Sequence, residues 1–447
     1  MNKYISNTSK QEEEMLASIG IDSVDRLFEC IPQSVRDKNR LEIPKGLSDL
    51  ELERHLSALA NKNANVNDYL CFIGAGAYDR YIPAVVKTIM RRQEFLTAYT
   101  PYQPEASQGL LQAIFEYQTM ICNLTGMEGS NASLYDAGSA LYEAVALSVS
   151  VKKKKKVLVS ACVNPRYRQV LNTYIKYRNM EIIEIPYENG VTDLSLIKTE
   201  DLKESSCVVI QNPNYLGCLE DMETISEFAK KNDLHFIVST NPVSLGLLKA
   251  PGEYEADIVT GDGQELGNPL SFGGPYLGFM AVSKPFIRKM PGRIVGQTVD
   301  NENRKGFVLT MQAREQHIRR EKAGSNICSN QALNALTAAV YMATMGKSGI
   351  VKVAELSFNK AHYLHDNLLK TGVFKKIYTS PFFMEFTLEY TGDIDLLEKK
   401  YLDKRIFFGH KIDKEYNELK NSLLIAVTEK LLKRDLDEYI RIAGDNI

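Results

Sequence analysis

Apolar runs alternate with amphipathic segments through the middle of the chain. Strands are predicted at VLVSAC (157–162), EIIEIP (181–186), CVVIQNP (207–213), HFIVSTN (235–241) and DIVTGDG (257–263). Between them, helices are predicted near 166–178, 194–203 and 221–231. This alternation predicts βαβ units and an α/β fold whose mostly parallel sheet is covered on both faces.

The two ends of the chain have different patterns. Residues 1–65 predict short amphipathic helices, which cannot bury a core alone and must therefore lie on the main body or on another chain. A small-residue helix near 329–345 precedes a tail that predicts a small α+β domain. Three parts are predicted: an N-terminal helical arm (1–65), a large α/β domain (66–328), and a linking helix with the C-terminal domain (329–447).

Composition narrows the function classes. With 54 basic and 56 acidic residues, the formal net charge of −2 gives no reason to expect a nucleic-acid or membrane partner. The N-terminus does not resemble a signal peptide and no apolar run is long enough for a membrane span, so a cytoplasmic protein is expected. The seven cysteines lack CxxC spacing and the six histidines lack HExxH or HxH spacing, which predicts reduced thiols and no metal site.

A stiff polar loop precedes the helix that is predicted to begin after Ser107. Between and beside Pro101 and Pro104 it carries Tyr99, Tyr102, Gln103 and Glu105. Two interpretations remain open. The tyrosines pack under the helix, or the loop presents them to a ligand or partner.

Two glycine-containing segments are candidate phosphate sites. FIGAGAYDRYIP (72–83) lacks the third glycine and the preceding strand of a dinucleotide site, which makes it a weak candidate. Gly138 and Ser139 open a predicted helix whose first amides could bind an anion. Plain helix capping explains the same residues and is the commoner case.

A basic cluster lies in AREQHIRREK (313–322), with three arginines and a lysine around His317: Arg314, Arg319, Arg320 and Lys322. Such a cluster suits a phosphate or carboxylate ligand. It suits a salt-bridged structural joint equally well, and the sequence leaves both interpretations open.

Several long segments resemble one family along essentially the whole chain. They include GAGAYDRYIP, FLTAYTPYQPEASQGLLQAIFEYQT, GDGQELGNPLSFGGPYLG, PGRIVGQTVD and LTMQAREQHIRREKAGSNICSNQAL. They resemble the glycine dehydrogenase (decarboxylating) family, the P-protein of the glycine cleavage system. The resemblance implies the pyridoxal phosphate (PLP)-dependent transferase fold type I, like aspartate aminotransferase. The length matches the N-terminal half, which is subunit 1 (alpha) in the split form.

The residue that should bind PLP differs from the family's other half. There, a His-Lys pair lies ten and nine residues before a Gly-Gly-Pro. Counting back from the Gly-Gly-Pro at 273–275 places Gly263 and Gln264 in those positions. Glutamine cannot form a Schiff base. The segment expected to supply an acid to the pyridinium nitrogen has Ser239 and Asn241 instead.

The resemblance implies a role within a complex. PLP would be bound covalently by the beta subunit (subunit 2), and the complex, expected to be (αβ)2, would decarboxylate glycine and pass the aminomethyl group to the lipoyl arm of H-protein. Fold type I sites lie at dimer interfaces, so this chain is expected to complete its partner's site. The loop residues Tyr99, Tyr102, Gln103 and Glu105 are the catalytic candidates.

Two further sets of candidates follow from the same resemblance. Ser107, Gln108, Arg314 and His317 are candidate substrate or interface contacts. Gly138, Ser139, Asn241 and Gln264 are candidates for a vestigial cofactor pocket. One alternative is a non-catalytic scaffold that stabilises beta or recruits H-protein. Another is an independent PLP enzyme that uses Lys249 or Lys284, although neither lies in the matching loop.

Overall fold

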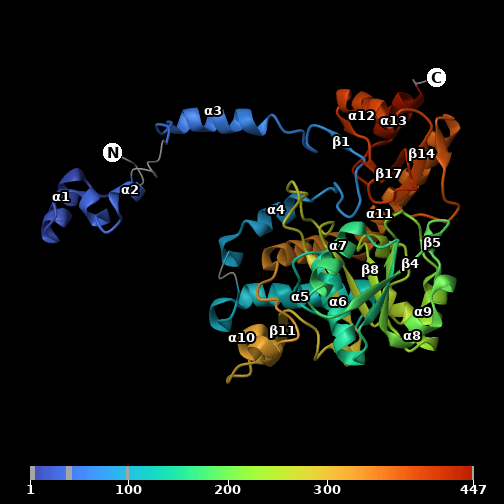
Figure 1. Ribbon diagram of the computed structural model, residues 1–447, viewed down its shortest axis with the longest axis horizontal. Helices are drawn as coiled ribbons and strands as arrows, with labels where there is room; N and C mark the ends of the chain where they lie inside the picture. Colours follow the sequence, from blue (N-terminus) through green and yellow to red (C-terminus); the bar gives the residue numbers. More distant parts are fainter. Residues whose placement is uncertain (1–5, 37–42, 97–99, 445–447) are drawn as a thin grey trace. The chain divides into compact units, whose positions relative to one another are not determined.

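The computed structural model describes residues 6–36, 43–96 and 100–444 (Figure 1). The chain divides into two compact units, residues 1–64 and 65–447. Among the described helices, none has the length and apolar character needed to cross a bilayer. All seven cysteines are free thiols, and four of them are buried.

The first unit consists of short helices: α1 (Ser9–Ser18), η1 (Val24–Phe28), α2 (Gln33–Arg36) and α3 (Asp49–Ala60). Thr8 and Ser48 close capping boxes with Gln11 and Glu51, which fixes where α1 and α3 begin. None of these four helices contains a buried residue. Their apolar side chains therefore remain available to another surface, as the sequence pattern predicts.

A seven-stranded sheet organises the second unit, in the order β2-β10-β9-β8-β7-β3-β4. Its parallel strands are β3 (Lys156–Ser160), β4 (Glu181–Ile185), β7 (Ser205–Asn212), β8 (His235–Thr240) and β9 (Ile258–Asp262). Next to β9, β10 (Gly278–Val282) runs antiparallel to it, and the edge strand β2 (Gly129–Ser130) pairs antiparallel with β10. All five predicted strands are present.

Helices cover both faces of this sheet. On one face lie α5 (Gln108–Thr125), α9 (Met222–Lys231) and the first part of α11 (Ala332–Lys370); on the other lie α6 (Ala137–Lys152) and α7 (Pro165–Ile175). Leu158 of β3 packs toward the first face, and Val157 and Val159 pack toward the second. Two-sided burial explains why the strands are continuous apolar runs.

Shorter elements complete the second unit around the sheet. They are α4 (Ala84–Met90), α8 (Thr199–Glu204), the paired strands β5 (Tyr187–Glu188) and β6 (Val191–Thr192), and α10 (Gln316–Arg319). The segment after 291 forms a hairpin of β11 (Ile294–Val299) and β12 (Lys305–Thr310), which is absent from the strands predicted from the sequence. Pairing between the two strands satisfies backbone groups that a loop would leave to water.

The C-terminal part has its own four-stranded sheet, ordered β13 (Phe374–Lys376), β14 (Glu385–Tyr390), β17 (Ser422–Ala426) and β16 (His410–Lys411). Its helices are α12 (Ile394–Asp403) and α13 (Lys433–Gly444), and α11 reaches it after a kink at Gly346. β1 (Leu70–Cys71) joins this part by pairing with β15 (Ile406–Phe407), as Figure 1 shows. Residues just after 65 thus contact the C-terminal domain.

Candidate functional site

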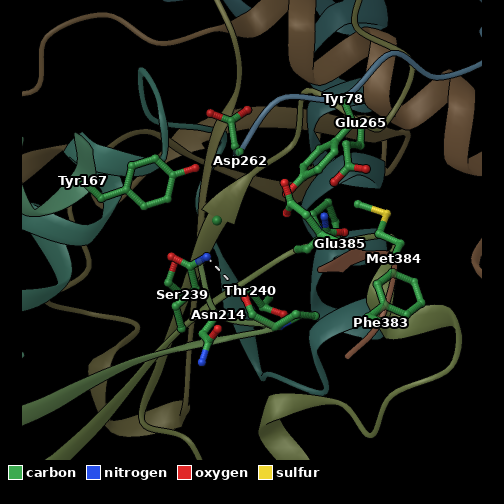
Figure 2. A pocket seen from close by; sticks show the side chains of 16 residues that line it. Tyr78, Tyr167, Asn214, Ser239, Thr240, Asp262, Glu265, Phe383, Met384 and Glu385 are labelled. Atoms are coloured by element: carbon green, nitrogen blue, oxygen red, sulfur yellow. Dashed lines mark hydrogen bonds between the residues drawn. The ribbon is translucent and has the colours of Figure 1, made fainter. Parts of the chain in front are cut away.

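A small crevice lies at the carboxyl ends of three parallel strands, where α/β proteins usually bind ligands. Strands β7, β8 and β9 each contribute lining residues, together with Tyr78, Tyr167 and Glu385. Figure 2 shows Tyr167 and Tyr78 on either side of Asp262. The cavity holds about 40 Å³, which is room for a few water molecules.

Asp262 ends β9 and closes the top of the crevice. Its carboxylate accepts hydrogen bonds from the Gln264 amide at 2.9 Å, the Leu277 amide at 3.4 Å and the Ala137 amide at 3.3 Å. Burial raises the pKa of Asp262 to about 7, although these three amides act in the opposite direction. The Asp262 carboxylate is therefore hydrogen-bonded to the Ala137 amide, the first amide of α6.

A second carboxylate occupies the start of the same helix. Asp136 is the N-cap of α6, and it accepts a hydrogen bond from the Ser139 amide at 2.7 Å. In turn, the Ser139 hydroxyl accepts a hydrogen bond from the Asp136 backbone amide, which completes a capping box. Gly138 is buried in the same turn. The predicted anion-binding turn is therefore filled by the protein's own acids.

Gln264, in the position of the family's lysine, is fully engaged with the backbone. Its side-chain oxygen accepts from the Tyr78 amide at 2.9 Å, and its nitrogen donates to the carbonyls of Tyr78 at 3.1 Å and Asn268 at 2.8 Å. The side chain is 1% exposed and does not line the crevice. It ties the 72–83 segment to the loop after β9.

Of the four predicted pocket residues, Asn241 is the one that lines the crevice. Its oxygen accepts from the amides of Val243 and Ser244, at 2.9 and 3.2 Å. The end of β8 therefore presents Ser239 and Thr240 before Asn241 along the crevice, and none of the three carries a carboxylate.

The GAGAYDRYIP segment places two polar side chains against buried acids. The Arg80 guanidinium lies 2.5 Å from Glu265 and 2.5 Å from Glu429, and all three side chains are buried. Because the two acids lie in the loop after β9 and in the C-terminal part, Arg80 joins three distant stretches of chain. Its charge is neutralised within the protein.

Glu385 of β14 receives the backbone of the same segment. It accepts from the Ala75 amide at 2.6 Å and from the Tyr78 hydroxyl at 2.7 Å. Burial raises the pKa of Glu385 to about 7. A Cβ on Gly74 would lie 2.2 Å from this carboxylate, so only glycine fits there. The segment therefore binds a carboxylate of the protein itself, which argues against the weak hypothesis of a phosphate-binding loop.

Together these contacts show that the crevice does not fit PLP. The first turn of α6 already holds two acids, Asp136 and Asp262. Gln264 cannot form an imine, and Glu385 adds a further acid to the lining of the crevice. A cavity of about 40 Å³ is also far smaller than an ordinary cofactor site.

A different cluster forms around the predicted loop. The Arg293 side chain donates to the Tyr102 hydroxyl at 2.5 Å, and its guanidinium lies 4.7 Å from the centre of the Tyr102 ring. The His317 ring approaches the other edge, with centroids 6.0 Å apart. Tyr102 nevertheless stays 49% exposed. The structure thus brings two predicted residues, Tyr102 and His317, together beside an arginine that was not predicted.

A buried ion pair supports this tyrosine. Arg293 and Glu315 are 3% and 7% exposed and contact each other directly. Arg293 also donates to the Cys328 carbonyl at 2.5 Å, and Glu315 lies 3.6 Å from the His317 ring. A buried arginine with fixed partners holds its contacts in one geometry. We call Tyr102, Arg293, Glu315 and His317 the tyrosine cluster.

The other loop candidates divide between exposed and structural positions. Gln103 and Glu105 are exposed, whereas Ser107 is buried at the start of α5. Gln108 exchanges hydrogen bonds of 2.8 and 2.9 Å with the Phe307 backbone, so it fastens the loop to β12. Tyr99 lies outside the described residues.

Arg314 lies apart from Tyr102, although it is close to Glu315 in sequence. Its guanidinium donates to the backbone carbonyls of Met290 and Gly292. Burial and the positive charge of Arg293 lower the pKa of Arg314 to about 10. The predicted basic cluster therefore splits, with His317 on the tyrosine cluster and Arg314 on another surface.

The comparisons with known proteins agree along the whole chain. The family model described as Glycine cleavage system P-protein matches residues 2–443. The probable glycine dehydrogenase (decarboxylating) subunit 1 of Geobacillus sp. (strain WCH70) is 50% identical over 445 residues, covering 100% of this chain and 99% of the relative. That of Carboxydothermus hydrogenoformans is 49% identical and covers 99% of each.

The chain belongs to the glycine cleavage system P-protein family. A solved glycine decarboxylase (P-protein) in inhibitor-bound form is 40% identical, with a TM-score of 0.91 over 100% of both chains. The glutamate decarboxylase of Lactobacillus brevis, at 13% identity, 93% and 96% coverage and a TM-score of 0.68, shares the fold alone. These findings confirm the predictions of a P-protein, of PLP-transferase fold type I and of a glycine decarboxylase subunit. The subunit 1 names imply a partner subunit.

The residues that sequence reasoning missed all make contacts between distant segments. Arg80 and Glu265 are 185 positions apart, and Arg293 and Tyr102 are 191 apart. One signal was available for Arg80, which with Asp79 supplies the charges of a segment otherwise rich in small and aromatic residues. Asp262 was visible as the acid that ends an apolar strand. Arg293 and Glu315 had no comparable signal.

Proposed function

We propose that this chain is the subunit of glycine decarboxylase that leaves covalent PLP binding to subunit 2 and completes the partner's active site. The assembled (αβ)2 enzyme would act in the cytoplasm, decarboxylate glycine and transfer the aminomethyl group to the lipoyl arm of H-protein. The observation that carries the proposal is that Gln264 stands in the lysine position, bonded to the backbone, while the protein's own carboxylates bond to the first turn of α6 beside the crevice.

The tyrosine cluster is the part of this chain that we assign to the partner's site. Tyr102 remains half exposed although its hydroxyl is fixed by the buried Arg293. Such a side chain is pre-organised, because its position costs little entropy when a substrate or partner arrives. Glu105 and Gln103 stand exposed on the same loop and would supply a proton acceptor and an amide.

Each residue has a limited role in this proposal. Tyr102 would contact the bound glycine or the partner's cofactor, and Arg293 would position Tyr102. His317, which packs against the Tyr102 ring and lies beside Glu315, would help to hold that ring in place. Tyr99, Ser107, Gln108 and Arg314 remain predictions as site or interface residues.

The test is reconstitution with subunit 2 and lipoylated H-protein, followed by release of labelled carbon dioxide from glycine. Tyr102→Phe is expected to lower turnover about ten-fold or more, because it removes the positioned hydroxyl. Tyr177→Phe, on a fully solvated tyrosine, is the matched control. Sedimentation of the same mixtures measures whether the complex still forms.

The runner-up function is a scaffold that only stabilises subunit 2 or recruits H-protein. The apolar faces of the first unit favour it, because none of its helices buries a residue within that unit. A scaffold predicts normal turnover for Tyr102→Phe whenever assembly is intact. Unchanged turnover for both Tyr99→Phe and Tyr102→Phe would therefore remove the loop from the active site and leave the scaffold.

A further inference from the structure

A second cavity of about 210 Å³ shares no lining residue with the crevice and borders the tyrosine cluster, because its lining residue Arg314 directly precedes Glu315. Its wall combines α6 with the segment that follows Phe286 and with the segment from Arg314 to Ser325. Five cationic side chains line it: Arg288, Lys289, Arg314, Arg319 and Lys322. We call this the cationic pocket.

The five cations lack acidic partners. Within the described ranges, none of them forms an ion pair, and Arg314 and Arg319 donate to backbone carbonyls instead. By contrast, the buried Arg80 and Arg293 are each matched by a carboxylate. Since the whole chain carries a net charge of −2, five uncompensated positive charges around one cavity are a strong local excess.

Arg314 forms the rigid part of the pocket. Its two terminal nitrogens are fixed by the carbonyls of Met290 and Gly292. These two contacts hold the guanidinium in one position, so Arg314 is the fixed cation of the set.

One carboxylate, Glu143 of α6, also lines the pocket. Burial raises its pKa to about 7, with a smaller opposing effect from a Ser325 hydrogen bond. Glu143 therefore opposes an incoming anion less than an ordinary carboxylate would. The hydroxyls of Ser150 and Ser325 line the same cavity and can donate to an oxyanion.

We infer that the cationic pocket binds a small phosphate-type dianion, either inorganic phosphate or the phosphate group of a phosphomonoester. A single carboxylate would neutralise only one of the five charges. A tetrahedral dianion has oxygens facing several directions, which suits forked arginines, point-like lysines and hydroxyls arranged around it. The site is separate from the crevice, since the two cavities share no lining residue.

The experiment is a titration of the full chain with inorganic phosphate at constant ionic strength, followed by calorimetry. Saturable binding with a dissociation constant of about 1 mM or tighter is expected. Glycerol 3-phosphate is the second probe, and it distinguishes a site for phosphomonoesters from a site for inorganic phosphate. Tighter binding of the ester assigns the site to phosphomonoesters, and tighter binding of phosphate assigns it to the free ion. Acetate, which carries one charge, should bind at least about ten-fold more weakly than either.

The decisive variant is the triple change R288Q/K289Q/K322Q, because all three side chains are exposed and their loss should not disturb folding. It is expected to weaken phosphate binding at least about ten-fold. The matched control is K153Q/K154Q/K155Q, which removes three charges from the lysine run at the end of α6. This control should change phosphate binding less than about two-fold.

Three results would overturn the inference. One is the absence of saturable binding of either probe, and another is equal weakening by the two triple variants. The third is phosphate binding that the free chain shows but the assembled enzyme with subunit 2 lacks, which would make the pocket a protein interface. Persistence of binding in the assembled enzyme supports the small-anion site.

Discussion

The crevice and the tyrosine cluster use similar residues in opposite ways. At the crevice, polar groups that could have met a cofactor already have partners within the protein: Gln264, beside the crevice, bonds to the backbone, and the first turn of α6 bonds to Asp136 and Asp262. In the tyrosine cluster, a buried arginine holds a half-exposed Tyr102 toward solvent. The difference teaches that this chain keeps the fold of a PLP enzyme, whereas its positioned, solvent-exposed side chain, Tyr102, lies outside the crevice.

The largest expected effect tests whether the crevice is now structural. Arg80→Leu leaves Glu265 and Glu429 buried without their cation. The free energy of unfolding is expected to fall by about 3–5 kcal/mol, as for other broken buried pairs. Denaturant unfolding of the full chain measures it. Arg92→Ala, in a solvent-exposed pair with Glu94, should leave the unfolding midpoint unchanged. A tolerated Arg80→Leu would mean that the network adds little to stability.

Restoring a lysine at position 264 tests whether the crevice can still bind PLP. Gln264→Lys should cost about 2–3 kcal/mol of unfolding free energy, because the Tyr78 amide loses its acceptor and an ammonium replaces a buried neutral group. It should not create PLP binding, since the carboxylates of Asp136 and Asp262 remain at the phosphate position. Absorbance spectra with added PLP, borohydride reduction and peptide mapping check this. A stoichiometric label on the new lysine would show that the crevice is still competent.

The free energy of unfolding, measured at a series of pH values, distinguishes buried acids from exposed ones. Glu385 has a pKa of about 7 in the folded chain and about 4.5 when unfolded. The folded state thus holds the proton that the unfolded state loses. The stabilisation that the raised pKa of Glu385 gives the folded state is complete below pH 4.5 and is lost as the pH rises to 7.

Glu385→Gln imitates the protonated acid and does not titrate. It should match the unchanged protein near pH 4.5 and exceed it in unfolding free energy by about 2 kcal/mol at pH 8. Glu227→Gln, at an exposed position, is the control and should follow the unchanged protein throughout. Parallel curves for the Glu385 and Glu227 variants would contradict a raised pKa at Glu385.

The smallest effect on stability is expected in the tyrosine cluster. Tyr102→Phe should change the unfolding free energy by about 1 kcal/mol or less, because the hydroxyl is one of several Arg293 partners. Its effect on turnover should be far larger, as proposed above. If Tyr102→Phe instead destabilised the chain as much as Gln264→Lys, the cluster would be a packing feature like the crevice.

Prediction from sequence succeeded where a pattern is local. The apolar runs predicted all five parallel strands, and the amphipathic pattern of residues 1–65 predicted short helices there. The hairpin after 291 was missed, because Gly, Asn and Asp in PGRIVGQTVDNENRKG look like turns until the two strands pair. For the site, counting from the Gly-Gly-Pro located Gln264, but not what its amide would bind.

The sequence by itself determined the family, the sheet and the missing lysine, because each depends on residue identity at a given spacing. Only the tertiary structure decided that Asp262 fills the start of α6, that Arg80 is neutralised by Glu265 and Glu429, and that Arg293 holds Tyr102. These pairings join residues more than a hundred positions apart. A side chain's charge is visible in the sequence, but its partner is set by packing, and the partner decides whether that charge is available for chemistry.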